Sequence, residues 1–351
     1  MKTNPFSPQF GIAPTIFIGR EVVLAEIQQA AKNKLSPWRN VLISAPRGYG
    51  KTALLSDLRG KFKANFVSLT MSKAFVNNLK DLLTDTARVS ELGFNSGFLN
   101  GKIQFKEKQS LLSILKEALN KRDLTVFMID EIQGCFDVLA EFAIAYQQLV
   151  QDGYNVMLLM AGLPAPIEKI MSQPNTTFLY RSKRVRLAPL NEKAVATAVT
   201  KMFKDTQKEI SVEQAETFAK NTQGYTYLVQ LFGYNLWQAT AKKVSDKLFY
   251  QVFDETIASL PGTTFSILLK DLSPSEYEIL EAMSQFEIAE AQDLVEVTKK
   301  SKQTVYNYTE KLIGTGLVER VERGKTKINI PFLRDYLNEA SLQSLEQDLF
   351  E

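Results

Sequence analysis

Two short segments constrain this chain more than any other part of its sequence. The first, residues 41–52, reads as an apolar strand, a glycine-containing loop that ends in Lys-Thr, and the start of a helix. Such a loop points backbone N–H groups at a polyphosphate, and the helix N-terminus adds partial positive charge behind them. In this P-loop pattern Lys51 reaches the β and γ phosphates, and Thr52 binds Mg²⁺ through its hydroxyl. The residues expected at the phosphates are Pro46, Arg47, Gly48, Tyr49, Gly50, Lys51, Thr52 and Ala53.

The second segment, residues 125–131, is an apolar strand that ends in two adjacent carboxylates. Five apolar or β-branched residues lead directly into Asp130 and Glu131, as in a buried central strand of a parallel sheet. In a nucleotide site Asp130 helps to bind the magnesium ion, and Glu131 polarises the attacking water. Neither segment is specific alone, but together they predict the two halves of a nucleoside-triphosphate hydrolysis site.

The first segment departs at one position from the pattern G-x-x-x-x-G-K-[ST], because Ala45 stands where the pattern has glycine. Alanine is the mildest replacement there. A Gly-Lys-Thr sequence also occurs in proteins without a nucleotide site. The preceding strand, the following helix and the second acidic strand favour the functional interpretation here.

The residue inventory excludes several other hydrolytic chemistries. The chain of 351 residues has no histidine and one cysteine, Cys135. It therefore cannot build a Ser-His-Asp triad, a Cys-His pair, a His-ligated zinc site or an internal disulfide. Cys135 is expected as a small buried side chain. Carboxylates and magnesium remain for hydrolysis.

Nothing in the sequence indicates a membrane or an export signal. The first residues contain no apolar h-region, and nowhere do about 18 uncharged apolar residues run together. We therefore expect a cytoplasmic protein without a membrane partner. The net charge of +3 is too small to identify a nucleic-acid partner by itself.

Three blocks are expected along the chain. Residues 1–190 form the nucleotide-binding core, which opens with an extended arm over residues 1–15. Its strands are predicted at 41–44, 65–69, 125–129, 155–160 and 183–187, and its helices at 22–32, 53–62, 75–89, 110–120 and 136–151. Alternation of strands and helices predicts an α/β fold with a parallel sheet covered on both faces. Residues 191–268 contain no convincing strand and are expected to form a helical lid.

Residues 269–351 form the third block, with helices predicted at 274–283, 289–297 and 302–313. Gly314 and Gly316 end the last helix, as glycine does at a C-cap. Two alternating segments, 317–322 and 326–330, follow as a hairpin. Three helices and a hairpin are typical of a winged helix.

One face of the third helix and the hairpin suggests DNA contact. Apolar residues fall on the inner face of the helix, and polar or basic residues fall on the other. Those side-chain types bind phosphates and base edges. The alternative is that the face is merely solvated or contacts protein. The expected DNA-binding residues are Lys300, Gln303, Thr304, Asn307, Lys311, Arg323 and Lys325.

The order of these motifs resembles the AAA+ ATPases. The branch is that of the origin-recognition and replication-licensing ATPases and the related STAND-type and transposition-regulator proteins. The resemblance rests on a Phe-Ile-Gly-Arg-Glu box at 17–21, the P-loop, the acidic strand, the helical lid and the winged helix. It implies that Ile16, Phe17 and Gly19 line the adenine pocket and that Arg20 anchors their turn. It also implies ATP or ADP and Mg²⁺ as cofactors.

The sequence departs from this family where sensor residues are expected. The strand 155–160 should lie between the P-loop strand and the acidic strand, but it continues into Ala-Gly-Leu-Pro, so no first sensor is assigned. The lid helix that carries Tyr225 has no arginine at its start. An arginine finger remains, and the resemblance implies Arg181, with Arg184 second, acting on a neighbouring subunit's nucleotide. Both arginines could equally belong to a solvated basic loop.

The combined interpretation is an ATP-hydrolysing switch. ATP favours self-association, and the winged helix places the resulting homo-oligomer on double-stranded DNA. Turnover depends on Glu131, Lys51 and Arg181 and is slow without assembly. The main alternative is a STAND-like regulatory NTPase whose winged helix contacts a protein partner, with slow or no turnover. A weaker alternative is a degenerate binder that holds ADP structurally. The sequence does not distinguish replication, transposition, plasmid maintenance and defence.

Overall fold

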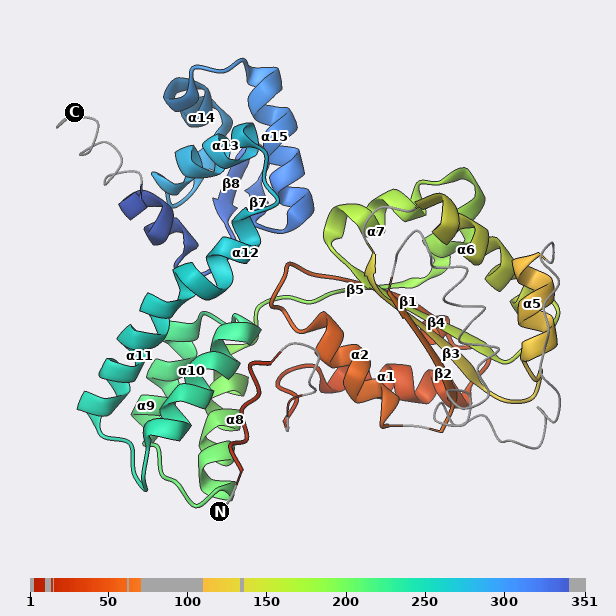
Figure 1. Cartoon of the computed structure of the whole chain (residues 1–351), viewed down its shortest axis with the longest axis horizontal. Coiled ribbons are helices and arrows are strands. Elements are labelled where there is room, and N and C mark those ends of the chain that lie inside the picture. Colours follow the sequence, from red (N-terminus) through yellow and green to blue (C-terminus); the bar gives the residue numbers. More distant parts are fainter. Residues whose placement is uncertain are drawn as a thin grey trace.

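A computed structural model describes residues 3–9, 14, 16–61, 63–70, 110–132 and 136–340 of the chain. The helix expected at 75–89 and the buried position expected for Cys135 lie outside these ranges. The described residues form a sheet-containing core, a helical lid beside it, and a third block that extends from the lid (Figure 1).

The core is a parallel sheet with its strands in the order β2-β3-β4-β1-β5. The strands are β1 Asn40–Ser44, β2 Asn65–Thr70, β3 Thr125–Ile132, β4 Val156–Gly162 and β5 Lys183–Arg186. The five strands expected from the sequence are thus confirmed, as is the place of β4 between the P-loop strand and the acidic strand. Their parallel direction brings the P-loop and Asp130 to the same edge of the sheet.

Alternating side chains of the strands pack into two separate layers. Val41 and Ile43 belong to the cluster that contains α1 and α2, whereas Leu42 faces the cluster that contains α5, α6 and α7. Figure 1 shows these two groups of helices on opposite faces of the sheet. Their bounds are α1 Glu21–Lys32, α2 Lys51–Arg59, α5 Leu111–Ala118, α6 Phe136–Gln151 and α7 Pro164–Met171. Short 3₁₀ turns cover Pro37–Arg39 and Pro174–Arg181.

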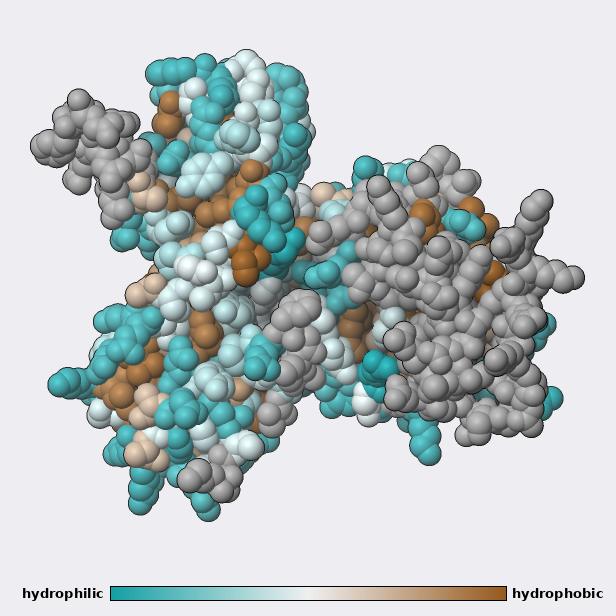
Figure 2. Space-filling model, in the orientation of Figure 1, coloured by the Kyte–Doolittle hydropathy of each residue, from teal (hydrophilic) through white to brown (hydrophobic). Residues whose placement is uncertain are grey.

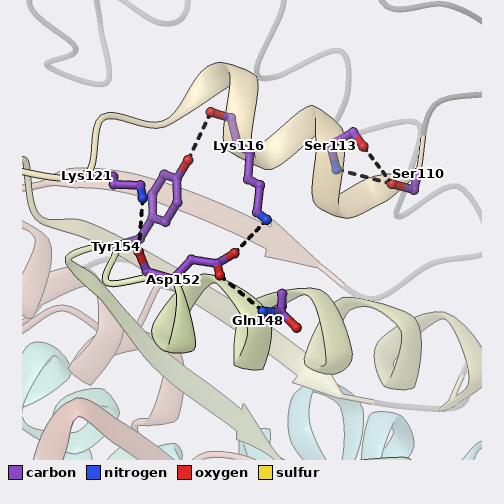
Figure 3. Close-up of polar contacts among 7 residues, drawn as sticks. All are labelled: Ser110, Ser113, Lys116, Lys121, Gln148, Asp152 and Tyr154. Atoms are coloured by element: carbon purple, nitrogen blue, oxygen red, sulfur yellow. Dashed lines mark hydrogen bonds and ion pairs between the residues drawn. The ribbon is translucent and has the colours of Figure 1, made fainter.

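A polar cluster joins α5 to the end of α6 (Figure 3). Asp152, in the turn that leads to β4, accepts from Lys116 at 2.6 Å and from Gln148 at 3.2 Å, and hydrogen bonding with Lys116 lowers the pKa of its carboxyl group. The backbone carbonyl of Asp152 accepts from Lys121 at 3.1 Å. Because this turn precedes β4, the cluster lies at the edge of the sheet opposite the P-loop and serves the packing of α5.

The lid consists of four helices, which are α8 Glu192–Asp205, α9 Val212–Thr222, α10 Thr226–Ala239 and α11 Asp246–Leu260. The last helix does not stop at the lid. It continues through a π-helical segment, Pro261–Phe265, into α12 Ser266–Leu269, and Figure 1 shows α11 and α12 in line. Pro261 removes one backbone donor inside the helix, which accounts for the irregular turn there. One continuous helix therefore joins the lid to the third block.

The third block contains the expected order of three helices and a hairpin. Its elements are α13 Pro274–Ser284, β6 Ala289–Glu290, α14 Ala291–Thr298, α15 Lys302–Thr315, β7 Val318–Glu322 and β8 Lys325–Ile328. One detail differs from the expected helix at 289–297, because Ala289 and Glu290 form a short strand that pairs with β8. Within the described ranges, no helix has both the length and the apolar character needed to cross a membrane.

Candidate nucleotide site

The P-loop joins β1 to α2 at the carboxyl edge of the sheet. Gly48 and Gly50 have φ of +81° and +85°, a conformation that a residue with Cβ adopts only with strain. Gly50 is the N-cap of α2, which begins at Lys51, two residues earlier than the expected helix. The glycines of the motif are therefore required by the backbone path of the loop.

A cavity of about 340 Å³ lies over this loop and brings the two sequence motifs together. Its lining includes Arg47, Gly48, Gly50, Lys51, Thr52 and Ala53 from the P-loop side and Asp130 and Glu131 from β3. The P-loop and β3 thus supply two cationic side chains, a hydroxyl and two carboxylates to the lining of the cavity. This donor and acceptor set fits a polyphosphate and its cation.

Lys51 is turned onto its own loop in this structure. Its Nζ donates to the backbone carbonyls of Ala45 and Pro46 at 2.8 and 2.7 Å. Burial lowers the pKa of Lys51 from its usual 10.5 to about 8, although the nearby carboxylate of Asp130 acts in the opposite direction. A polyphosphate would give the ammonium group a stronger anionic partner and raise that pKa again.

The pKa of Lys51 predicts how nucleotide affinity depends on pH. Ligand-free protein loses the Lys51 proton near pH 8, whereas the complex retains it, so binding above pH 8 requires proton uptake. Affinity is then constant below pH 8 and falls by up to about tenfold per pH unit above it. Isothermal titration calorimetry with ATP from pH 7.5 to 9.5 measures this dependence.

Two substitutions control this prediction. Lys51→Arg keeps a charged side chain over the whole range and should flatten the pH profile, while Lys51→Ala should abolish binding. A wild-type affinity that is constant from pH 7.5 to 9.5 would contradict the assignment of this proton to Lys51.

The acidic end of β3 has an irregular backbone that the sequence did not indicate. Glu131 has φ of +53°, and the pairing register of β3 with β4 shifts between Ile129 and Ile132. The backbone N–H of Glu131 donates to Asp130 Oδ1 at 2.8 Å. Asp130 is half-buried and Glu131 is exposed. Both carboxylates line the cavity, but the bulge gives them different surroundings, because Asp130 is half-buried and held by a backbone N–H whereas Glu131 is exposed.

Thr52 and Asp130 fit a magnesium ion that is shared with phosphates. Mg²⁺ in such sites takes one or two protein oxygens and fills its remaining positions with phosphate oxygens and water. The lining of the cavity contains the Thr52 hydroxyl and the Asp130 carboxylate. The described ranges contain no group of three or more Asp, Glu, Cys or His side chains that could hold a metal ion without phosphate ligands.

Several residues expected at the nucleotide do not line this cavity. Ile16 and Phe17 line a second hollow, next to α8, and the cavity over the P-loop does not include them. Arg20 donates to the carbonyl of Ala188 at 2.5 Å and so ties its turn to the segment between core and lid. Gly19 and Pro46 also lie outside the lining of the cavity.

Tyr49 of the P-loop faces the third block instead of the cavity. It is 2% exposed, and its hydroxyl donates to the carbonyl of Asn329 at 3.2 Å. Gly316, at the end of α15, packs so closely on Pro46 that a Cβ there would stand 2.9 Å from the proline. Arg47 also forms an exposed ion pair with Asp271 at 3.6 Å. The P-loop is therefore in direct contact with the third block.

The lid closes over the P-loop through the start of α10. The backbone N–H of Tyr227 donates to Gly48 O at 3.0 Å, and the Tyr225 hydroxyl donates to Arg47 O at 3.4 Å. A Cβ on Gly48 would stand 2.2 Å from the Tyr225 hydroxyl. The Tyr225 ring thus occupies the space above the loop. It stands at the start of α10, where the family resemblance predicts an arginine.

Sequence reasoning did not identify the other walls of the cavity. They come from the N-terminal arm, from β4 and the start of α7, from α10 and from the helix that joins the lid to the third block. These lining residues are Ser7, Pro8, Gln9, Pro14, Gly162, Leu163, Tyr225, Thr226, Tyr227, Gln230, Thr263, Thr264, Ile267 and Leu268. No local motif marks them, because they converge only when the arm and the lid fold onto the core.

The face of the third block that was expected to bind DNA is exposed but largely paired. Gln303, Asn307 and Lys311 of α15 are exposed, and Figure 2 shows hydrophilic residues over much of the outer surface of this block. Thr304 lies in the first turn, where its backbone N–H donates to Ser301. The basic residues Lys300, Lys311, Arg320, Lys325 and Lys327 each have a carboxylate partner within the block.

Arg323 forms no ion pair with any described residue. Over residues 262–337 the chain has ten basic and twelve acidic side chains. The block therefore lacks the net positive charge that is typical of a DNA-binding module.

The two candidate arginine fingers differ in their contacts. Arg181 is exposed at the end of the 3₁₀ turn and contacts no ring or carboxylate among the described residues. Arg184 lies over the ring of Tyr180 at 5.7 Å. Arg181 therefore has fewer side-chain contacts among the described residues than Arg184.

Comparison with known protein families matches two parts of the chain. Residues 37–171 match the AAA domain family, and residues 262–337 match a domain of unknown function. The first match spans the P-loop and the acidic strand. The second match begins in the π-helical segment and covers α12 and the third block. No curated protein matches the sequence.

Solved structures share the fold over nearly the whole chain. The Walker-type ATPase of Pyrococcus abyssi is 16% identical with a TM-score of 0.68, covering 92% of this chain and 96% of its own. The ORC2 protein of Aeropyrum pernix, in ADPNP-ADP complexes, is 14% identical with a TM-score of 0.64 and 98% coverage of both chains. Cdc6p of Pyrobaculum aerophilum is 16% identical with a TM-score of 0.51, and the match covers 97% of this chain and 98% of the Cdc6p chain.

At these identities the likeness is one of fold. It agrees with the parallel five-stranded sheet, the P-loop at its carboxyl edge and the helices that follow. The chain therefore has a P-loop AAA+ fold, and its residues 37–171 are similar to the AAA domain family.

Proposed function

We propose that this protein is a magnesium-dependent ATPase that uses nucleotide binding to change its contacts with other molecules. The observation that carries the proposal is the cavity in which Lys51 and Thr52 of the P-loop meet Asp130 and Glu131 of β3. The AAA family match and the nucleotide complexes described for the Aeropyrum pernix ORC2 protein support ATP or ADP as the ligand.

Each side chain has a distinct task in this proposal. Lys51 leaves the carbonyls of Ala45 and Pro46 and pairs with the β and γ phosphates. Thr52 and Asp130 hold Mg²⁺, which neutralises phosphate charge when bound. Glu131, which lines the cavity, accepts a proton from the water that attacks the γ phosphate.

Nucleotide binding is coupled to the third block by direct contact. The P-loop touches that block through Tyr49 and Pro46, and the helix joining the lid to the block supplies Thr264 and Leu268 to the cavity wall. A phosphate that moves the loop, or a ligand that moves this helix, therefore shifts the third block relative to the core. We propose that this shift exposes a surface for self-association.

The partner of the third block is proposed to be double-stranded DNA, contacted through α15 and the β7–β8 hairpin as a winged helix. The shape and exposure of α15 support this. The pairing of its basic residues and its excess of acidic side chains favour a second candidate, a protein partner with basic groups. The two candidates differ in how binding responds to salt and to charge reversal.

The double variant Arg323→Glu with Lys325→Glu tests the DNA contact. Loss of two phosphate contacts should weaken duplex binding by about tenfold or more near 0.1 M salt and reduce the slope of log affinity against log salt by about two. Fluorescence anisotropy with a labelled duplex in the presence of ATP measures both quantities. The matched control reverses two exposed lid lysines, Lys204→Glu with Lys220→Glu.

Two results would contradict DNA binding by the third block. If affinity and salt slope change in the lid control but not in the double variant, duplex DNA is bound by the lid and not by the third block. If the parent protein with ATP binds no duplex at 0.1 M salt and duplex DNA does not stimulate its ATP turnover, a protein partner is favoured.

A further inference from the structure

We propose that Gln230 of the lid, oriented by the N-terminal arm, recognises the base of the nucleotide and selects adenine over guanine. The inference rests on the proposed function, because it assigns the base end of the same cavity. It concerns residues that no sequence motif marks.

The orientation of the Gln230 amide follows from its contact with the arm. Gln230 is 6% exposed, and its Oε1 accepts from the backbone N–H of Ser7 at 2.9 Å. A backbone N–H can only donate, so the oxygen must face the arm and the NH₂ group must face away. That NH₂ group has no partner among the described residues, and Gln230 lines the cavity. A buried amide therefore has a free donor and a second lone pair on its oxygen beside the cavity.

The arm is firmly attached to the lid at this point. Phe6 is 3% exposed, and its ring meets that of Phe203 edge-on at 6.0 Å. It also covers Gly233, where a Cβ would stand 2.3 Å from the ring. Asn4 donates to the carbonyl of Tyr234 at 3.1 Å. Ser7 is thus held in place by the contacts of Asn4 and Phe6, which precede it, and the Gln230 amide is held with it.

Gln230 lies at the right depth for a base. Thr226, one helical turn earlier, stands over the P-loop, with its methyl group 3.4 Å from the position of a Cβ on Gly50. A turn of α10 carries Gln230 roughly 6 Å farther from the phosphate side. The lining of the cavity also includes Pro8 and Pro14 of the arm and Leu268 of the joining helix. Apolar and ring surfaces of this kind suit the faces of a planar base, and the amide suits its edge.

The chemistry of the amide favours adenine. The N6/N7 edge of adenine has one donor and one acceptor, which a glutamine amide matches with its oxygen and its NH₂ group. The same edge of guanine has two acceptors, O6 and N7. Guanine would therefore place its O6 opposite Gln230 Oε1. Both oxygens are acceptors, so their lone pairs repel each other and no hydrogen bond forms. Because Ser7 prevents the amide from turning over, the mismatch cannot be relieved by rotation.

Calorimetric titration of the full chain with ATP, GTP, 7-deaza-ATP and inorganic tripolyphosphate tests the inference. The parent protein should bind ATP at least about tenfold more tightly than GTP or 7-deaza-ATP. Gln230→Glu keeps an oxygen that accepts from Ser7 but replaces the NH₂ donor with a second oxygen. ATP affinity should therefore fall by about tenfold, and the variant should bind ATP and 7-deaza-ATP equally. Tripolyphosphate affinity should not change. Gln223→Glu, on the exposed end of α9, adds the same charge to the lid as a matched control.

A second pair of variants separates the arm from the amide itself. Gly233→Ala displaces Phe6 and should reduce the ratio of ATP affinity to GTP affinity without changing the affinity for tripolyphosphate. Gly262→Ala, where a Cβ would meet nothing within 4 Å, is its control. Thermal unfolding of each variant reports whether the lid remains folded.

The outcomes distinguish this inference from the proposed function. If tripolyphosphate and ATP bind but the parent shows no base preference, or the preference survives Gln230→Glu, base selection by Gln230 is wrong and the phosphate site stands. If neither ATP nor tripolyphosphate binds, the proposed function fails and this inference fails with it.

Discussion

The substitution Glu131→Gln is expected to lower ATP turnover by about 10²- to 10⁴-fold while ATP affinity stays within about twofold of the parent. The amide preserves the shape of the side chain but cannot accept the proton of the attacking water. Glu131 is exposed on a bulge, so its replacement leaves no buried group without a partner. Steady-state phosphate release and calorimetric ATP titration measure the two quantities separately.

Glu168→Gln is the matched control for this prediction, because Glu168 is an exposed glutamate on the neighbouring helix α7. It should have no effect on turnover. Equal turnover in Glu131→Gln and the parent would remove Glu131 from the mechanism. Loss of ATP affinity together with turnover would instead assign Glu131 to binding.

The substitution Arg181→Ala is expected to lower the turnover of assembled protein by about 10³- to 10⁵-fold, the usual contribution of an arginine finger. ATP affinity should persist, because Arg181 does not line the cavity of its own chain. The loss should appear only at protein concentrations at which the parent is assembled. Turnover against concentration, with analytical ultracentrifugation of the same samples, tests both statements.

Mixing two inactive variants tests whether the arginine acts on a neighbouring subunit. Arg181→Ala retains Glu131, and Glu131→Gln retains Arg181, so a mixed assembly contains interfaces with both groups intact. Activity should therefore reappear on mixing. Lys183→Ala is the control, and Arg184→Ala tests the second candidate. No recovery on mixing, with assembly confirmed, would exclude Arg181 as a finger that acts in trans.

The core of this protein was accessible from sequence because its signals are local. Apolar runs of four to eight residues separated by helical patterns indicated five parallel strands, and the structure has them in the order that places β4 between the P-loop and the acidic strand. Gly48 and Gly50 signalled the loop because its backbone demands positive φ. Lys51, Thr52, Asp130 and Glu131 follow strands of one sheet, so their meeting at its edge follows from the topology.

Other expectations depended on distant contacts and did not follow from local pattern. Tyr49 lies within the P-loop motif, yet it is buried against Asn329, which is 280 residues later in the chain. The basic side chains of α15 and the hairpin looked available for DNA, but carboxylates from neighbouring elements pair with most of them. Sequence spacing describes one element at a time and does not record these partners.

The sequence by itself determined the P-loop, the acidic strand and the α/β core, because strand and loop propensities are set by neighbouring residues and parallel strands share an edge. Only the tertiary structure decided which residues enclose the cavity. The arm, α10 and the joining helix meet there because Phe6 and the apolar faces of the lid bury themselves in a common core. Burial is nondirectional and acts between residues far apart in the chain, so no short motif indicates that Gln230 and Ser7 line the same cavity as Lys51.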